Sequence, residues 1–217
     1  MCLPIKLIIF DLDGTLVDAY QAVARSLNYA FQKVGLPALD DNTIKNNVGW
    51  GDRNLIRRFI AEEDLDKVLR IYRRHHKKAL KTGTKFLPGA KKIVLDLERK
   101  GYKLAVASNR PTFFTQIILK HLKVMGCFDY VLCADKVQRP KPAGDMLKQI
   151  LKKLSVSAKE TLYIGDMTID IQCGQAAGIR TVAVATGSST PQEIRPLKPF
   201  KMIRRIHQLN RVLNQMH

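Results

Sequence analysis

Short apolar runs and amphipathic helical segments alternate over most of this chain, and this order limits the folds open to it. Strands are predicted over residues 102–108, 128–134, 161–166 and 181–186, with helices over 90–101, 112–126, 144–154 and 169–178. Strict alternation of this kind predicts a parallel sheet with helices on both faces. The apolar run IKLIIF at residues 5–10 is typical of one more strand, buried on both sides.

Residues 18–83 interrupt the alternation. Their apolar residues recur at helical spacing, which predicts helices over 19–36, 41–61 and 62–81. Because the first strand must join the later ones, this segment is an insertion. We expect a Rossmann-like α/β core from residues 1–17 and 84–217 and an all-helical cap from 18–83. Open α/β sheets bind ligands at the carboxyl ends of their strands, so the cap should cover that edge.

The chain is strongly basic, with 37 Lys and Arg against 19 Asp and Glu among its 217 residues, a formal charge of +18. Such a charge favours an anionic small molecule, a nucleic acid or a membrane surface as partner. The basic residues are scattered, and none lies in a glycine-rich or aromatic-interleaved nucleic-acid module. A generally basic surface is favoured, and nucleic acid stays open as a partner. Residues 198–217 are predicted to form one basic amphipathic helix.

No apolar stretch approaches the roughly 18 to 20 residues that span a bilayer. The first residues contain one lysine and an apolar run that ends in two aspartates, unlike a signal peptide. The cysteines, Cys2, Cys127, Cys133 and Cys173, have no metal-site spacing and are predicted to be buried, reduced thiols. We therefore expect a cytoplasmic protein with no membrane partner.

Polar residues gather where the predicted strands end. Two acids, Asp11 and Asp13, follow the first strand, and two residues apart they project to the same side. Carboxylates so close repel unless a cation lies between them or one is protonated. Together with Asp166 they form an all-oxygen site that suits Mg²⁺. The sequence thus predicts a magnesium site built from Asp11, Asp13 and Asp166.

The same residue types suit phosphoryl transfer. A carboxylate can attack phosphorus and form an acyl phosphate, and Asp11 is the candidate nucleophile. Asp13 can act as general acid and base. Ser108, the Asn109 amide and Lys141 are donors for the transferred phosphoryl group. These residues predict a magnesium-dependent phosphoric monoester hydrolase that acts on a small anionic phosphate ester through an aspartyl-phosphate.

Four segments, DLDGTLVD, the strand ending VASNR, the Lys-Pro of RPKPAGD, and YIGDMTIDIQCGQAAG, resemble the four successive motifs of the haloacid dehalogenase superfamily of phosphatases. The resemblance implies that Asp11 is the nucleophile and that Asp13 is the acid/base and a backbone magnesium ligand. It implies a phosphate clamp of Ser108 and Lys141, an acidic metal ligand, Asp166, and a supporting role for Asp170 in the last loop. ARSLNYAFQKVGLP and NVGWGDRNLI are similar to phosphoglycolate phosphatases.

Two positions depart from the family pattern. Arg110 stands where a lysine is commoner, which is expected to alter the phosphate environment slightly, and Gly144 stands where many relatives carry a second proline. In the cap, Arg53 either meets a second anion of the substrate or, as is favoured, is solvated. The run Arg73–Lys78, with its two adjacent histidines, is predicted to be a solvated helix face.

Other functions stay open. A sugar phosphomutase or a pyrophosphatase could use the same site. Mutases of this superfamily usually carry a histidine soon after the first motif, where this chain has DAYQAVARSLN. From a different class, the charge of +18 would suit a nucleic-acid-binding protein on a phosphatase scaffold. A monomer or a homodimer is expected.

Overall fold

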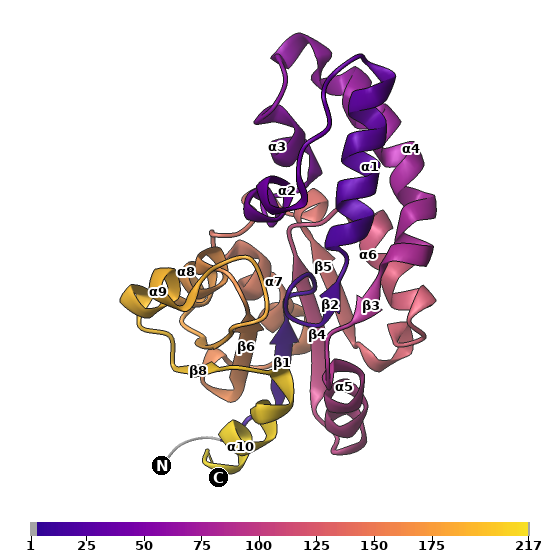
Figure 1. The fold of residues 1–217 in the computed structure, drawn as a ribbon. Coiled ribbons are helices and arrows are strands. Elements are labelled where there is room, and N and C mark those ends of the chain that lie inside the picture. The colour runs from indigo at the N-terminus through magenta and orange to yellow at the C-terminus, as the bar shows by residue number, and fades with distance from the viewer. Residues whose placement is uncertain (1–3, 217) are drawn as a thin grey trace.

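A six-stranded sheet in the order β5-β4-β1-β6-β7-β8 forms the centre of the protein, whose computed structural model describes residues 4–216 (Figure 1). The strands are β1 (Leu7–Phe10), β4 (Lys103–Ser108), β5 (Tyr130–Cys133), β6 (Thr161–Gly165), β7 (Arg180–Val184) and β8 (Lys201–Ile203). Every neighbouring pair is parallel. The predicted α/β fold with a parallel sheet is therefore confirmed.

Alternate residues of β1 pack into different layers, as the two-residue period of a strand requires. Ile8 and Phe10 join the apolar cluster of one face, beneath α5 (Ala90–Arg99), α6 (Thr112–His121) and α10 (Leu209–Asn214). Leu7 and Ile9 join the cluster of the other face, beneath α7 (Asp145–Leu154) and α8 (Thr168–Ala177). Burial on both faces explains why β1 is apolar throughout. A short helix, α9 (Pro191–Ile194), follows β7.

The helices of residues 18–83 lie beyond the carboxyl ends of the sheet strands (Figure 1). They are α1 (Tyr20–Lys33), α2 (Asp41–Asn47), α3 (Asp52–Arg57) and α4 (Leu65–Gly83). These helices enclose an apolar cluster of their own, which includes Leu27, Phe31 and Tyr72. A small antiparallel pair, β2 (Val17–Asp18) and β3 (Lys85–Phe86), joins the chain entering this segment to the chain leaving it.

The predicted continuous helix over residues 41–61 is wrong. The chain leaves the helical conformation at Val48, and Gly49 and Gly51 then adopt positive φ angles of 102° and 87°. Only glycine takes such angles without a steric penalty, so these two residues divide the helix into α2 and α3. The loop between them, residues 48–51, turns toward the carboxyl edge of the sheet.

The predicted single helix over residues 198–217 is also wrong within the residues described. Lys201–Ile203 instead forms β8 at the edge of the sheet, and only Leu209–Asn214 is α-helical. Beside the strand, the Phe200 amide donates to the Thr181 carbonyl oxygen at 2.9 Å. The segment forms a strand because it hydrogen-bonds to the edge of β7. The helical periodicity of the sequence does not reveal such a partner.

Three of the four cysteines lie in the described part of the chain, and all three are free thiols. Cys133 and Cys173 are buried as predicted, whereas Cys127 is half-buried. The expectation for Cys2 lies outside the described residues. Over residues 4–216 no helix combines the length and apolar character needed to cross a bilayer.

Candidate active site

A cavity lies at the carboxyl ends of β1, β4 and β6, between the sheet and the helical segment 18–83. From the sheet side it is lined by Asp11, Asp13, Ser108, Asn109, Lys141 and Asp170. From the helical segment it is lined by Tyr20, Val23, Val48, Gly49, Gly51, Asp52, Leu55 and Tyr72. One wall is thus rich in charged groups, and the opposite wall is largely apolar.

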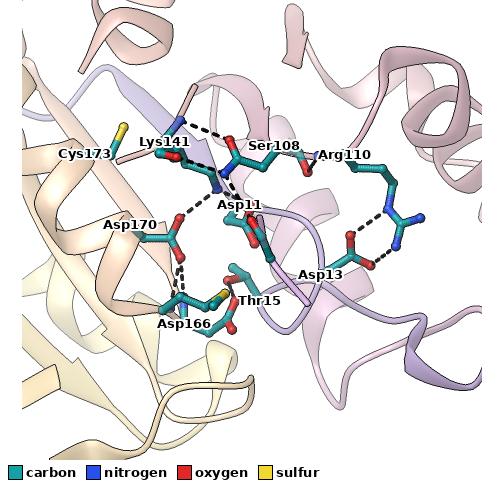
Figure 2. A network of polar contacts seen from close by, with 12 residues as sticks. Asp11, Asp13, Thr15, Ser108, Arg110, Lys141, Asp166, Asp170 and Cys173 are labelled. Atoms are coloured by element: carbon teal, nitrogen blue, oxygen red, sulfur yellow. Dashed lines mark hydrogen bonds and ion pairs between the residues drawn. The ribbon is translucent and has the colours of Figure 1, made fainter. Parts of the chain in front are cut away.

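Lys141 is the buried cation of the charged wall (Figure 2). Its Nζ donates to Asp11 Oδ1 at 2.6 Å, to Asp170 Oδ1 at 2.7 Å and to the Tyr163 hydroxyl at 3.1 Å. Burial alone would lower the pKa of Lys141, but the charges of Asp11 and Asp170 outweigh it and raise the pKa. An ammonium group has three protons, so all of them are engaged and Lys141 is held in its charged form.

Three carboxylates surround this lysine. One oxygen each of Asp11, Asp166 and Asp170 lies within 4.8 Å of the others, and all three side chains are buried. Burial raises the pKa of Asp11 to about 7, against the lowering effect of Lys141. Burial, with the charges of Asp11 and Asp170, raises the pKa of Asp166 well above its usual range. One lysine cannot neutralise three carboxylates, so a hard cation with oxygen ligands fits this cluster.

Asp170 braces the loop that carries Asp166. Its Oδ2 accepts from the backbone N–H groups of Asp166 at 3.2 Å and Met167 at 3.0 Å. Its Oδ1 accepts from Lys141 and from the Tyr163 hydroxyl, the latter at 2.7 Å. Both oxygens of Asp170 are therefore occupied by the protein, whereas Asp11 is held through Oδ1 alone among the residues described.

Four residues that were not predicted as site residues surround Asp166: Thr15 and Ser188 hold it, and Gly14 and Gly187 leave room for it. Thr15 Oγ1 donates to Asp166 Oδ1 at 2.8 Å, and the Ser188 amide donates to Oδ2 at 3.2 Å. A Cβ atom on either Gly14 or Gly187 would overlap the Asp166 carboxylate. Gly187, in VAVATGSS, could have been predicted to lie near the site, because a glycine at a strand end often marks a close approach of another group to the backbone.

Asn109 links the charged wall to the helical segment. Its side-chain amide donates to the carbonyl oxygens of Gly49 and Lys141, both at 3.1 Å, and its Oδ1 accepts from the Lys141 amide at 3.0 Å. Both hydrogens of the side-chain amide are thus committed to the backbone. The hydroxyl of Ser108, 2% exposed, accepts from the Arg110 amide at 3.2 Å.

The side chain of Asp13 points away from the other acids and pairs with Arg110 (Figure 2). Arg110 Nε donates to Asp13 Oδ2 at 2.7 Å, and Nη2 donates to Oδ1 at 2.8 Å. The expected small change in the phosphate environment stays a prediction for Arg110. Arg110 holds Asp13 by a bidentate ion pair, the strongest geometry available to these two groups.

The predicted solvated face over Arg73–Lys78 is wrong for His76, which is fully buried. Its ring stacks on Tyr72 with centroids 4.8 Å apart and meets Phe114 edge to face at 4.9 Å. Arg110 Nη1 lies 2.8 Å from His76 Nε2. His76 occupies the position four residues after Tyr72 and four before Leu80, both buried, so helical spacing was the signal that could have found it.

The tautomer of His76 follows from its partners. A guanidinium can only donate, so Nε2 must accept from Arg110 and the proton must lie on Nδ1. Nδ1 then donates to Ser26 Oγ at 3.0 Å, and that hydroxyl donates to the Ala22 carbonyl at 2.7 Å. Burial, together with the Arg110 charge, lowers the pKa of His76 to about 2. The imidazole is therefore neutral near pH 7.

Acid should destabilise the protein through His76. The unfolded chain takes up a proton near pH 6.5 that folded His76 does not accept, so this contribution to stability is present above pH 6.5 and is lost as pH falls toward 2. Between pH 7.5 and pH 5 the loss is about 2 kcal/mol. We expect His76→Gln to remove that part of the pH dependence of the unfolding free energy, measured by denaturant titration. His121→Gln, at an exposed position of α6, is the control, and an unchanged slope in His76→Gln would contradict the prediction.

Arg53 lies outside the cavity. It is exposed, and its Nη1 pairs with Asp66 Oδ1 at 2.6 Å. Of the two alternatives for Arg53, contact with a substrate anion or exposure to solvent, this position agrees with exposure to solvent. Its neighbour Asp52 does line the cavity but pairs with Arg73 at 2.7 Å. The helical segment therefore presents no unpaired cation of the loop 48–53 to the cavity.

Fold and site together define an α/β enzyme that works at the carboxyl edge of a parallel sheet. The chain belongs to the haloacid dehalogenase-like hydrolases, whose family model matches residues 8–184. The resemblance carried by the four sequence motifs is thus confirmed.

Individual relatives cover nearly the whole chain. The phosphoglycolate phosphatase of Aliivibrio fischeri is 31% identical over 206 residues, 90% of each chain, and that of Aquifex aeolicus is 29% identical over 182 residues, 84% of this chain and 85% of its own. A crystal structure described as a predicted phosphoglycolate phosphatase from Haemophilus somnus is 26% identical, covers 96% of this chain and 97% of its own, and superposes with a TM-score of 0.91.

Proposed function

We propose that this protein is a magnesium-dependent phosphatase that hydrolyses a small phosphorylated metabolite through an aspartyl-phosphate on Asp11. Phosphoglycolate is the leading candidate substrate. The observation that carries the proposal is the buried cluster in which Lys141 holds one oxygen of Asp11 beside Asp166 and Asp170. Membership of the hydrolase family and the similarity to phosphoglycolate phosphatases support it.

In this proposal Asp11 is the nucleophile that attacks phosphorus. Lys141 fixes its Oδ1, while Oδ2 accepts no hydrogen bond from any of residues 4–216. In the first step a bond forms between Oδ2 and phosphorus as the bond from phosphorus to the ester oxygen breaks. Lys141 and Ser108 then stabilise charge on the phosphoryl oxygens.

Asp13 completes the chemistry as general acid and base. Once it has left Arg110, it takes up a proton from water and gives that proton to the departing ester oxygen in the first step. In the second step it takes a proton from the water that attacks phosphorus, and the bond from phosphorus to Asp11 breaks to release inorganic phosphate. Asp13 must leave Arg110 to do this, because both of its oxygens are engaged there.

The metal site of the proposal consists of Asp11, Asp166 and the backbone of Asp13. The oxygen-only donors and the excess of buried negative charge fit Mg²⁺. When bound, the cation supplies positive charge that reduces the repulsion between the phosphate ester and the acidic cluster.

The division into a core of residues 1–17 and 84–217 and a cap of 18–83 is part of the proposal. A separate apolar cluster within the helical segment supports it, as does the contact of the Gly49 carbonyl with Asn109. A cap that closes on the site excludes bulk water and limits substrate size. We therefore favour small metabolites over phosphoproteins. The cytoplasmic location and the choice between monomer and homodimer stay predictions.

Phosphate release from a panel of esters tests the function. The protein, stripped of metal by a chelator, is assayed with phosphoglycolate, sugar phosphates, nucleotides and pyrophosphate, with and without Mg²⁺. We expect turnover of phosphoglycolate that Mg²⁺ restores by at least about 100-fold over the metal-free enzyme.

Other outcomes of the panel would contradict the proposal. Isomerisation of a sugar phosphate in the presence of its bisphosphate would identify a mutase, and turnover of pyrophosphate alone would identify a pyrophosphatase. If no ester is hydrolysed and nucleic acid binds with an affinity that falls steeply with salt, the protein is a binding protein on this scaffold.

A further inference from the structure

Asp13 and Arg110 form an ion pair at the surface of the cavity. Both residues line the cavity, and their side chains are 22% and 10% exposed, respectively. The guanidinium presents Nε and Nη2 as a fork to the Asp13 carboxylate, at 2.7 and 2.8 Å. This arrangement fits a planar carboxylate and fits a single phosphate oxygen or a hydroxyl less well.

Arg110 is the one cation available to a second anion among the residues described around the cavity. The other lining cation is Lys141, whose three protons are donated to Asp11, Asp170 and Tyr163. Around Arg110 the wall is formed by apolar or aromatic side chains, including Leu55, Tyr72 and Phe114. A charged leaving group in this part of the cavity would be desolvated and unpaired unless it reached Arg110.

The helical segment fixes the orientation of this guanidinium. Arg110 Nη1 donates to His76 Nε2, and His76 is in turn tied to Ser26 of α1. With its remaining edge anchored on α4, the fork of Nε and Nη2 stays directed at the cavity whichever carboxylate occupies it. His76 thus acts through Arg110 and is a positioning residue.

We propose that Arg110 recognises a carboxylate on the leaving group of the substrate and that this carboxylate displaces Asp13 from the guanidinium. This inference rests on the proposed phosphatase function and deepens it. An ester without a carboxylate leaves Asp13 in its bidentate pair, with neither oxygen free for the ester oxygen. An ester with a carboxylate both gains the ion pair and releases Asp13 for proton transfer. Substrate selection and activation of Asp13 are thereby one event.

Two substrates that differ only in this group test the proposal. Phosphoglycolate is compared with its amide, 2-phosphoglycolamide, which is nearly isosteric but uncharged at the leaving group. For the wild type we expect a kcat/KM ratio on the order of 100 in favour of the carboxylate, the worth of a charge-assisted bidentate contact. In Arg110→Gln the ratio should fall to nearly 1, and in Arg110→Lys, which keeps the charge without the fork, to an intermediate value.

The His76 variants test its positioning role. His76→Gln keeps an acceptor for Arg110 and should retain most of the ratio, whereas His76→Leu should lose it. A change confined to folding would lower kcat/KM for both esters equally and leave the ratio unchanged. His75→Gln is the matched control, because His75 contacts Ser26 but not Arg110.

Failure of this inference can be told apart from failure of the proposed function. If the wild type hydrolyses phosphate esters but the ratio is near 1, or if Arg110→Gln and Arg110→Lys both keep the wild-type ratio, Arg110 does not select a carboxylate and the phosphatase function stands. A preference for sugar phosphates together with a ratio near 1 would likewise overturn the role of Arg110 and leave the phosphatase function standing. If no phosphate ester is hydrolysed, both proposals fail together. Circular dichroism of each variant identifies loss of folding, and Arg110→Lys keeps the test decisive if Arg110→Gln does not fold.

Discussion

Replacing Asp11 by asparagine should lower kcat for phosphate release by roughly 10⁴-fold or more, the size of effect expected when a nucleophile is removed. An amide of the same shape cannot form the aspartyl-phosphate, and it also loses the charged partner of Lys141 at 2.6 Å. Lys141 keeps its contact with Asp170, so the folded structure should persist. The measurement is inorganic phosphate release under saturating phosphoglycolate and Mg²⁺, for wild type and variant in parallel.

Asp64→Asn is the control for this substitution, because Asp64 is an exposed acid at the start of α4. It should keep wild-type activity. Substrate binding to Asp11→Asn, measured by calorimetry, should persist, since the other phosphate contacts are retained. An Asp11→Asn enzyme that keeps more than about a tenth of wild-type kcat would show that another group attacks phosphorus.

Loss of Lys141 should have the largest effect on stability. In Lys141→Met the buried cluster loses the lysine that pairs with Asp11 and Asp170, and breaking a buried ion pair in this way costs about 3 to 5 kcal/mol. We expect this decrease in the unfolding free energy in metal-free buffer, measured by denaturant titration. Phosphate release should also fall by roughly 10² to 10³-fold, because a positive charge beside the transferred phosphoryl group is gone.

Magnesium should oppose the loss of stability, because a cation that binds only the folded state stabilises it by mass action. The unfolding free energy of Lys141→Met should therefore rise more steeply with Mg²⁺ concentration than that of the wild type. Lys148→Met, at an exposed position of α7, is the matched control and should change neither quantity. Unfolding of Lys141→Met that matches the wild type without metal would mean that the cluster does not depend on this lysine.

The sheet and its main helices could be predicted because their signals are local. Apolar runs such as IKLIIF and helical spacing after residue 88 need only neighbouring residues to be read. The edge strand β8 could not be found in this way. Its pairing depends on the free edge of β7, a partner that lies almost twenty residues away in the sequence.

The candidate site was only partly predictable for a related reason. The sequence brings Asp11, Asp13 and Asp166 to one edge of the sheet, but it does not give the direction of each side chain. In the structure the cluster contains Asp170, whereas the Asp13 side chain turns to Arg110. Arg110 is in turn held by His76, which lies on a helix of the inserted segment. The sequence around His76 is a run of basic residues, so it was predicted to be solvated.

Because β1 lies at the centre of the sheet, the site at its end can form only late in the synthesis of the protein. β1 leaves the ribosome before the other strands of the sheet, and its neighbours β4 and β6 begin only at residues 103 and 161. Until β6 and α8 emerge, the strand that carries Asp11 has one unpaired edge, and neither Asp166 nor Asp170 exists to join it. The acidic cluster therefore assembles late, from contacts of high sequence separation, which are slow to form. A nascent chain that stops short of this point holds the candidate nucleophile but no catalytic site.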